Sequence, residues 1–165
     1  MPALCDVSNK PGWFWHASEY PKSARKLLEI YYKFVGRNCK LLLNAPPNSS
    51  GHIYAEDIQV LRKFSKLRCS IFSHNLAASA SLNSSSTRGG FRDTRCSPYK
   101  VLEDGIHTYW AHKENQSKWI LYTNLKELVS FNVLQAQEHV HMGQRVIKFY
   151  LEALSRAGLW IQFLF

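Results

Sequence analysis

The chain lacks several patterns that would place it in a common protein class. Its 165 residues contain no run of about 18 consecutive apolar residues, so no membrane span is predicted. Its first residues lack the basic and then apolar layout of a signal peptide. Its four cysteines form no CxxC pair, which argues against a zinc ribbon and a thioredoxin-like redox motif. We therefore expect no metal and no cofactor, and the pairing of the cysteines stays open.

Acidic residues are scarce, because 12 Asp and Glu face 21 Lys and Arg, for a formal net charge of +9. The basic residues are scattered and form no long cluster, so nucleic acid is not expected as a partner. A basic surface would suit an anionic polysaccharide matrix, or it would simply aid solubility. Charge alone selects no function.

The first half of the chain alternates helix and strand signals. Apolar residues at helical spacing predict a helix from Pro21, with Gly36 placed to stop it. Residues 39–43 are too few for a helix and predict a buried strand of the parallel type, followed by a Pro-rich loop. A second helix is expected over 56–72, with two acidic residues suited to the dipole at its start. This order is typical of α/β folds.

The second half has the pattern of an antiparallel β domain. Residues 77–90 are small and polar, and we place a domain boundary near Ser73. Apolar residues alternate with polar ones further on, and about four strands are expected, with Gly143 in a turn between two of them. The alternating residues are Val129, Phe131, Val133, Ile147, Phe149 and Leu151.

Both halves look incomplete. Two α/β elements cannot close a barrel, and about four strands do not complete a β-sandwich. The closing run 159–165 is hydrophobic and would need a partner sheet or chain to cover it.

Aromatic rings, an imidazole and carboxylates are concentrated near the N-terminus, around a Pro-Gly dipeptide. Trp13, Trp15 and His16 lie between the two carboxylates Asp6 and Glu19. A tryptophan can cover the C–H face of a pyranose, while a carboxylate can donate a proton to a leaving group. This segment therefore predicts half of a sugar-cleaving site.

Simpler interpretations of the same residues remain open. Glu19 could only favour the start of the helix near Pro21 through the dipole, and the aromatic residues could be core. Asn44 directly follows the predicted strand, where barrel enzymes place functional residues, but Asn is also at home before a Pro-Pro turn.

Other features have weaker functional interpretations. His139 and His141 would share one strand face, a possible metal arrangement, but no third ligand is evident. Residues 88–90, Arg-Gly-Gly, could cradle an anion but lack a following helix and a Walker lysine. Trp110 and Trp119 could bind glycan, although sandwich cores usually use such residues for packing.

Three sequons permit glycosylation if the chain is secreted. They begin at Asn48, Asn83 and Asn115.

Several segments together resemble the plant-type alpha-L-fucosidases of glycoside hydrolase family 29, over their C-terminal half. The segments are Cys5-Asp6-Val7-Ser8, Pro11 to Glu19, Val35-Gly36-Arg37-Asn38, Leu41 to Asn48 and Gly143-Gln144-Arg145-Val146. The resemblance implies the last part of a (β/α)8-like barrel over 1–72, followed by a truncated, galactose-binding-like antiparallel β-sandwich over 73–165.

The resemblance also implies a chemistry. The family releases terminal L-fucose from glycoconjugates or cell-wall oligosaccharides by a retaining double displacement, which needs two carboxyl groups about 5 Å apart. Glu19 aligns with the acid/base position, Asp6 is the competing candidate, and Trp13, Trp15, His16 and Asn44 would bind the sugar. The nucleophile of the family lies upstream of residue 1.

We therefore expect a fragment that is inactive alone, from a family whose full-length members are extracellular or apoplastic. The alternative is a noncatalytic carbohydrate-binding or interaction module built on the β half.

Overall fold

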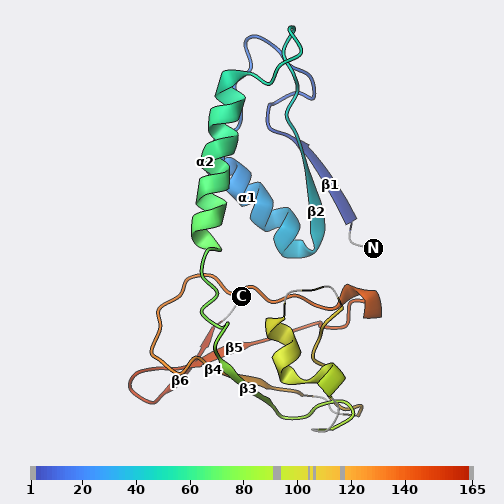
Figure 1. Ribbon diagram of the computed structural model, residues 1–165, viewed down its shortest axis with the longest axis vertical. Helices are drawn as coiled ribbons and strands as arrows, with labels where there is room; N and C mark the ends of the chain where they lie inside the picture. The colour runs from blue at the N-terminus through green and yellow to red at the C-terminus, as the bar shows by residue number, and fades with distance from the viewer. Residues whose placement is uncertain (1–2, 91–93, 104, 106, 116–117, 164–165) are drawn as a thin grey trace. The chain divides into compact units, whose positions relative to one another are not determined.

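The computed structural model describes residues 3–90, 94–103, 105, 107–115 and 118–163 (Figure 1). The chain separates into two compact units, Met1–His74 and Asn75–Phe165, and each is described by itself.

The first unit is built around two parallel strands. β1 (Ala3–Ser8) pairs with β2 (Cys39–Asn44) in the register Ala3↔Cys39 to Ser8↔Asn44. Parallel neighbours need a crossover connection, and helix α1 (Ala24–Phe34) supplies it. The parallel character predicted for the strand over 39–43 is confirmed, whereas β1 was not recognised as a strand from its mixed composition.

The ends of α1 differ from the sequence prediction by a few residues. The helix begins at Ala24, after the predicted Pro21, because the Ser23 side chain accepts a hydrogen bond from the Lys26 backbone N–H at 3.2 Å. It does not stop at Gly36, since a 3-10 turn η1 (Val35–Arg37) continues through that residue. Asn38 instead reverses the chain with a left-handed φ of 62°, a conformation that Asn tolerates well.

The cap of α1 gives a first testable prediction. Ser23→Ala should lower the free energy of unfolding by about 1 kcal/mol, because one N–H of the first turn loses its acceptor. Urea denaturation of the 165-residue chain would measure this change. Ser23→Thr is the matched control, since it keeps a hydroxyl acceptor, and equal destabilisation by both variants would contradict the capping role.

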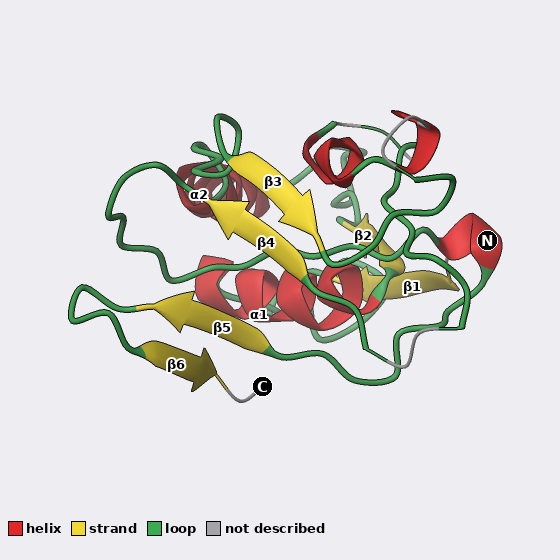
Figure 2. Ribbon diagram, turned by 90° about the horizontal axis from the view of Figure 1, so that it is seen from below, coloured by secondary structure: helices red, strands yellow, loops and turns green. Residues whose placement is uncertain are grey.

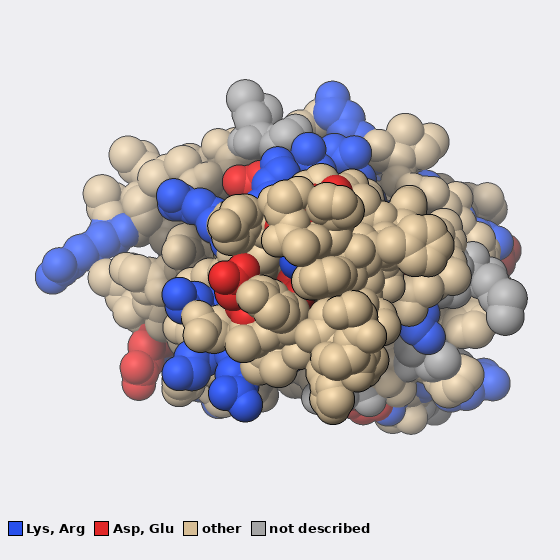
Figure 3. All heavy atoms as spheres, turned by 90° about the horizontal axis from the view of Figure 1, so that it is seen from above, with Lys and Arg blue, Asp and Glu red and all other residues tan. Residues whose placement is uncertain are grey.

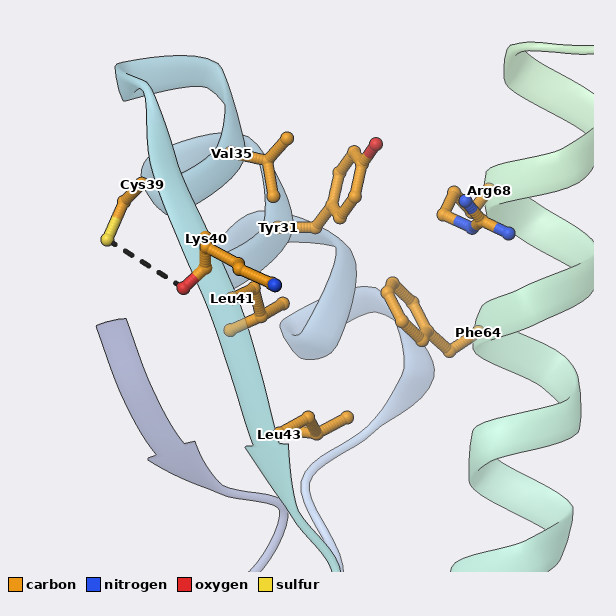
Figure 4. A pocket seen from close by; sticks show the side chains of 8 residues that line it. All are labelled: Tyr31, Val35, Cys39, Lys40, Leu41, Leu43, Phe64 and Arg68. Atoms are coloured by element: carbon orange, nitrogen blue, oxygen red, sulfur yellow. Dashed lines mark hydrogen bonds between the residues drawn. The ribbon is translucent and has the colours of Figure 1, made fainter. Parts of the chain in front are cut away.

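Helix α2 (Ala55–Ile71) packs against α1 through aromatic side chains. The ring of Tyr31 on α1 lies 6.3 Å from that of Phe64 on α2, and Leu27 is 1% exposed at the centre of the unit. A hollow of about 410 Å³ is lined by residues of α1, η1, β2 and α2 (Figure 4). The helices therefore cover one face of the two-stranded sheet.

A disulfide links the two strands of the first unit, between Cys5 of β1 and Cys39 of β2. Their Cα atoms are 5.9 Å apart, within the range that a disulfide spans. Cys69 is an exposed free thiol and Cys96 a buried one. The sequence left this pairing open, because a separation of 34 residues gives no local signal.

The described residues of the second unit form two antiparallel strand pairs (Figure 2). β3 (Ser81–Ser84) pairs with β4 (Leu121–Asn124), and β5 (Leu151–Leu154) pairs with β6 (Trp160–Phe163). Where the structure describes the connections between these strands, they contain the 3-10 turns η2 (Thr94–Cys96), η3 (Pro98–Leu102) and η4 (Val140–Met142). Within the described ranges no barrel and no sandwich closes.

The predicted strand around Phe131 is wrong, and the one around Phe149 is right only at its end. Phe131 and Phe149 lie outside strands, whereas Leu151 begins β5. Ile147 is 100% exposed in the described part of the chain, so the alternation does not bury its apolar side there. The hairpin turn is also not at Gly143. It lies between β5 and β6, where Gly158 has a φ of +78° and the Ser155 N–H bonds to the Leu159 carbonyl at 2.8 Å.

The hydrophobic C-terminal run is largely uncovered where the structure describes it. Leu159 is 67% and Trp160 64% exposed, while Leu164 and Phe165 lie outside the described residues. In the same described part of the chain, no helix is long and apolar enough to cross a membrane. Nor do its His, Cys, Asp and Glu side chains form a group of three that could hold a metal ion.

Candidate functional site

Two candidate residues lie in the parallel strands themselves, Asp6 within β1 and Asn44 as the last residue of β2. Side chains alternate along a strand, so Asp6 and its partner Leu42 share one face, as do Ser8 and Asn44. Leu41 and Leu43 point to the helix-covered face. Asp6 and Asn44 therefore belong to the face that α1 and α2 leave open, on which Leu42 is 49% exposed.

The loop after β1 is tied down at both ends by its backbone. The Asn9 N–H donates to the Asn44 carbonyl at 2.9 Å and extends the parallel ladder by one residue. The Lys22 N–H returns to the Asn9 carbonyl at 2.6 Å, and the Lys22 ammonium donates to the carbonyls of Ser8 and Lys10. These hydrogen bonds hold the two ends of the loop 10–21 together, and most of the predicted site residues lie on this loop.

Glu19 lies inside this loop and faces its Pro-Gly bend. Its carboxylate accepts a hydrogen bond from the Gly12 N–H at 3.2 Å, and its backbone carbonyl accepts one from the Lys10 ammonium at 3.0 Å. A Cβ at Gly12 would lie 3.3 Å from both carboxylate oxygens, so a larger residue there would crowd the carboxylate. The glycine allows this close approach.

Asp6, Trp13 and Asn44 meet at a second hollow, of about 440 Å³, on the open face of the sheet. Trp13 is 52% exposed there, and its backbone carbonyl accepts a hydrogen bond from the Asn44 side-chain amide at 2.8 Å. Phe14 also lines the hollow and is 86% exposed, although sequence reasoning did not assign it to the site. Glu19, Trp15 and His16 are not among the lining residues.

Trp15 and His16 have other partners. The Trp15 ring lies 6.3 Å from that of Tyr54, in a tilted arrangement. The His16 Nδ1 lies 2.8 Å from the Ser18 hydroxyl and accepts a hydrogen bond from the Ser18 N–H at 3.3 Å. The structure thus divides the predicted site into a hollow around Asp6 and Asn44 and a loop around Glu19 and His16.

Sequence reasoning missed a buried polar cluster beneath the loop, formed by Asn9, Lys10 and Asp57, each 0% exposed. The Lys10 ammonium lies 3.4 Å from Asp57 Oδ1, which also accepts a hydrogen bond from the Asn9 amide at 2.9 Å. The sequence predicts only one role for Asp57, a negative charge that favours the start of helix α2 through the helix dipole. No periodic pattern or motif marks a contact between these distant residues.

Burial lowers the pKa of Lys22, while the negative charge of Glu19 opposes that shift. Because both Lys10 and Lys22 approach the loop, two cations neighbour the Glu19 segment.

The candidate residues of the second unit make contacts that suit packing. The Trp110 indole N–H donates to the Ser86 carbonyl at 3.2 Å, and Trp119 stacks on His112 with ring centroids 4.4 Å apart. His139 stacks on Tyr109 at 4.3 Å. One face of each of the Trp119 and His139 rings is therefore already occupied.

His141 stacks with His107 at a centroid distance of 5.7 Å. At the possible anion cradle, Arg88 lies 3.4 Å from the Glu114 carboxylate, which already balances its charge.

The three sequon asparagines have different surroundings. The Asn48 side-chain oxygen accepts bonds from Ser50 and His52, and the exposed Asn83 lies in β3. Asn115 has a left-handed φ of 66°, and the rest of its sequon lies outside the described residues.

The surface charge agrees with the scattered basic residues of the sequence. Figure 3 shows Lys and Arg side chains among Asp, Glu and uncharged residues on the face drawn.

Comparison with known proteins identifies relatives of the chain. No protein-family model matches it. Alpha-L-fucosidase 1 of Arabidopsis thaliana is 59% identical over 161 residues, which are 97% of this chain and 32% of the relative. A relative from Oryza sativa subsp. japonica is 56% identical over 154 residues, 93% of this chain and 30% of the relative.

Solved structures show the same relationship. A family 29 fucosidase of Ruminococcus gnavus, solved in complex with fucose, is 30% identical with a TM-score of 0.67 over 74% of this chain and 24% of that one. The crystal structure of SpGH29 is 31% identical with a TM-score of 0.65, over 75% of this chain and 26% of that one. The chain is therefore similar to plant alpha-L-fucosidases and to solved family 29 fucosidases, and it spans about a third of the length of the curated relatives that it matches.

Proposed function

We propose that this chain forms one wall of the fucose site of a retaining alpha-L-fucosidase and carries its acid/base, Glu19. The observation that carries the proposal is the loop after β1, in which the Glu19 carboxylate is held by the Gly12 N–H at 3.2 Å. Trp13, Trp15 and His16 lie on the same loop. The identity of 59% with an alpha-L-fucosidase supports the assignment of this loop to that chemistry.

The proposed architecture follows the family. Residues 1–72 would contribute the last part of a (β/α)8-like barrel, in which functional residues follow the carboxyl ends of parallel strands. The β1–β2 pair, covered by helices on one face, supports this placement. Residues 73–165 would contribute part of a β-sandwich, which the two antiparallel strand pairs support.

The proposed substrates are fucosylated glycans or cell-wall oligosaccharides. The fucose complex of the Ruminococcus gnavus relative supports this class of ligand. Trp13, with half of its surface exposed beside Asn44, offers an apolar ring next to an amide, a combination that suits a sugar face and its hydroxyl groups. A secreted, glycosylated form, extracellular or apoplastic, is part of the same proposal.

Two carboxylates compete for the acid/base role. Glu19 has the supporting hydrogen bonds, whereas Asp6 lines the hollow with Trp13 and Asn44. A retaining glycosidase needs a second carboxyl group about 5 Å from the first to form the glycosyl-enzyme intermediate. By its resemblance to the family, we assign that nucleophile to a segment other than this chain.

A hybrid enzyme tests the proposal. In it, this chain replaces the 161 matched residues of the Arabidopsis thaliana relative, whose remaining two thirds are kept. We expect the hybrid to release nitrophenol from an aryl alpha-L-fucoside and the isolated 165-residue chain to release none. The unmodified relative is the control. A folded but inactive hybrid contradicts the proposal, and turnover by the isolated chain contradicts the need for a second segment.

A further inference from the structure

The buried cluster beneath the loop has no role in the chemistry proposed above. Lys10 and Asp57 are 0% exposed and form an ion pair at 3.4 Å. In the described part of the chain, Asp57 Oδ2 and Asn9 Oδ1 accept no hydrogen bond. Burying two charges together with unsatisfied oxygens is a poor way to stabilise a fold, because apolar side chains of similar volume usually do as well.

The cluster connects helix α2 to the backbone of Glu19. Asp57 lies in the first turn of α2 and holds the Lys10 ammonium. The same ammonium donates to the Glu19 carbonyl at 3.0 Å, and the Glu19 carboxylate accepts from the Gly12 N–H at 3.2 Å. Gly12 follows Lys10 by two residues. The contacts of Lys10 and Gly12 with Glu19 therefore join the beginning of the loop to its end.

Lys22 anchors the same loop independently. Its ammonium binds the carbonyls of Ser8 and Lys10, so it closes the loop downstream of Glu19. It makes no contact with Asp57 in the described hydrogen bonds and ion pairs. Loss of the Asp57 contact should therefore free the Lys10 ammonium and the backbone at Glu19, while the hydrogen bonds of Lys22 still hold the two ends of the loop together.

We propose that Asp57 is a positioning residue for Glu19, acting through Lys10. By holding the lysine ammonium under the loop, the carboxylate sets the backbone at Glu19 and keeps its side chain against the Gly12 N–H. The catalytic meaning of this arrangement rests on the proposed function. The arrangement itself can be tested without any activity.

The test uses NMR on the full 165-residue chain. The chemical shift of the Gly12 amide proton should change as the Glu19 carboxylate titrates, because the amide donates directly to it. Glu19→Gln should abolish that change and thereby assign it. We expect Asp57→Asn and Lys10→Met each to reduce the change to the level of Glu19→Gln, although Glu19 is intact in both.

Two further variants separate positioning from general loss of stability. The double variant K10M/D57N removes both buried charges, so it should recover stability relative to either single variant but still lose the Gly12 response. Leu27→Ala destabilises the same unit through its buried core and should keep the response.

A wild-type Gly12 response in Asp57→Asn or in the double variant would overturn the proposal, as would its loss in Leu27→Ala. If the response behaves as expected but Glu19→Gln leaves the hybrid enzyme fully active, the proposed function fails and the positioning by Asp57 stands.

Discussion

Glu19→Gln should lower kcat of the hybrid enzyme by about 10²–10⁴-fold, the usual contribution of a general acid–base group. The amide cannot protonate the leaving oxygen, and it cannot deprotonate the water that resolves the glycosyl-enzyme intermediate. The loss should be larger for substrates with poor leaving groups, because these depend most on protonation. Steady-state rates on aryl fucosides of different leaving-group pKa would measure it.

Azide provides a second readout for the same position. In Glu19→Ala, azide should restore turnover, because this small anion attacks the intermediate without a general base. The product should be fucosyl azide of retained configuration, which a chromatographic assay would identify. Absence of rescue would contradict the assignment of Glu19 as the acid/base.

Asp6→Asn is the matched control, because Asp6 is the other carboxylate of the predicted site. Asp6 lines the hollow with Trp13 and Asn44, so its substitution should weaken binding and raise KM more than it lowers kcat. If Asp6→Asn shows the larger fall in kcat together with azide rescue, the acid/base role belongs to Asp6.

Asp57→Asn should destabilise the first unit by about 3–5 kcal/mol, because it leaves the Lys10 charge buried without a partner. Lys10→Met should have a similar cost, since it leaves the buried Asp57 carboxylate without its cationic partner. Urea denaturation of the full chain would measure both, with unchanged m-values as evidence that the compactness of the states is preserved.

The double variant K10M/D57N distinguishes a desolvated ion pair from a partly hydrated one. When both charges are removed, the total cost should be well below the sum of the two single costs. Strict additivity would contradict the coupling. A cost of less than about 1 kcal/mol for Asp57→Asn would show that the pair behaves like an exposed salt bridge.

Local features of the first unit were predictable from the sequence. Residues 55–71 form the expected helix within one residue at each end, and the parallel strand expected over 39–43 spans 39–44. These elements depend on apolar periodicity and turn residues, which act over a few neighbours. The start of α1 was misplaced by three residues because Ser23, and not Pro21, satisfies the N–H groups of the first turn.

The predictions failed where a segment needs a distant partner. The alternation around Phe131 has the period of a strand, but a strand also needs a hydrogen-bonded neighbour and a second layer. β1 was missed for the opposite reason: Asp6 and Ser8 interrupt its apolar pattern, Asp6 on the open face of the sheet and Ser8 buried at the end of the strand.

The sequence by itself determined the relationship to the fucosidases and the kinds of side chain available to a site, since both depend on residue identity and short-range order. Only the tertiary structure decided how those side chains are grouped. The parallel register places Asp6 and Asn44 on the open face, the loop turns Glu19 toward Gly12, and Asp57 reaches Lys10 from the start of α2. Such groupings are decided by strand register and burial between segments far apart in the chain, which no local pattern encodes.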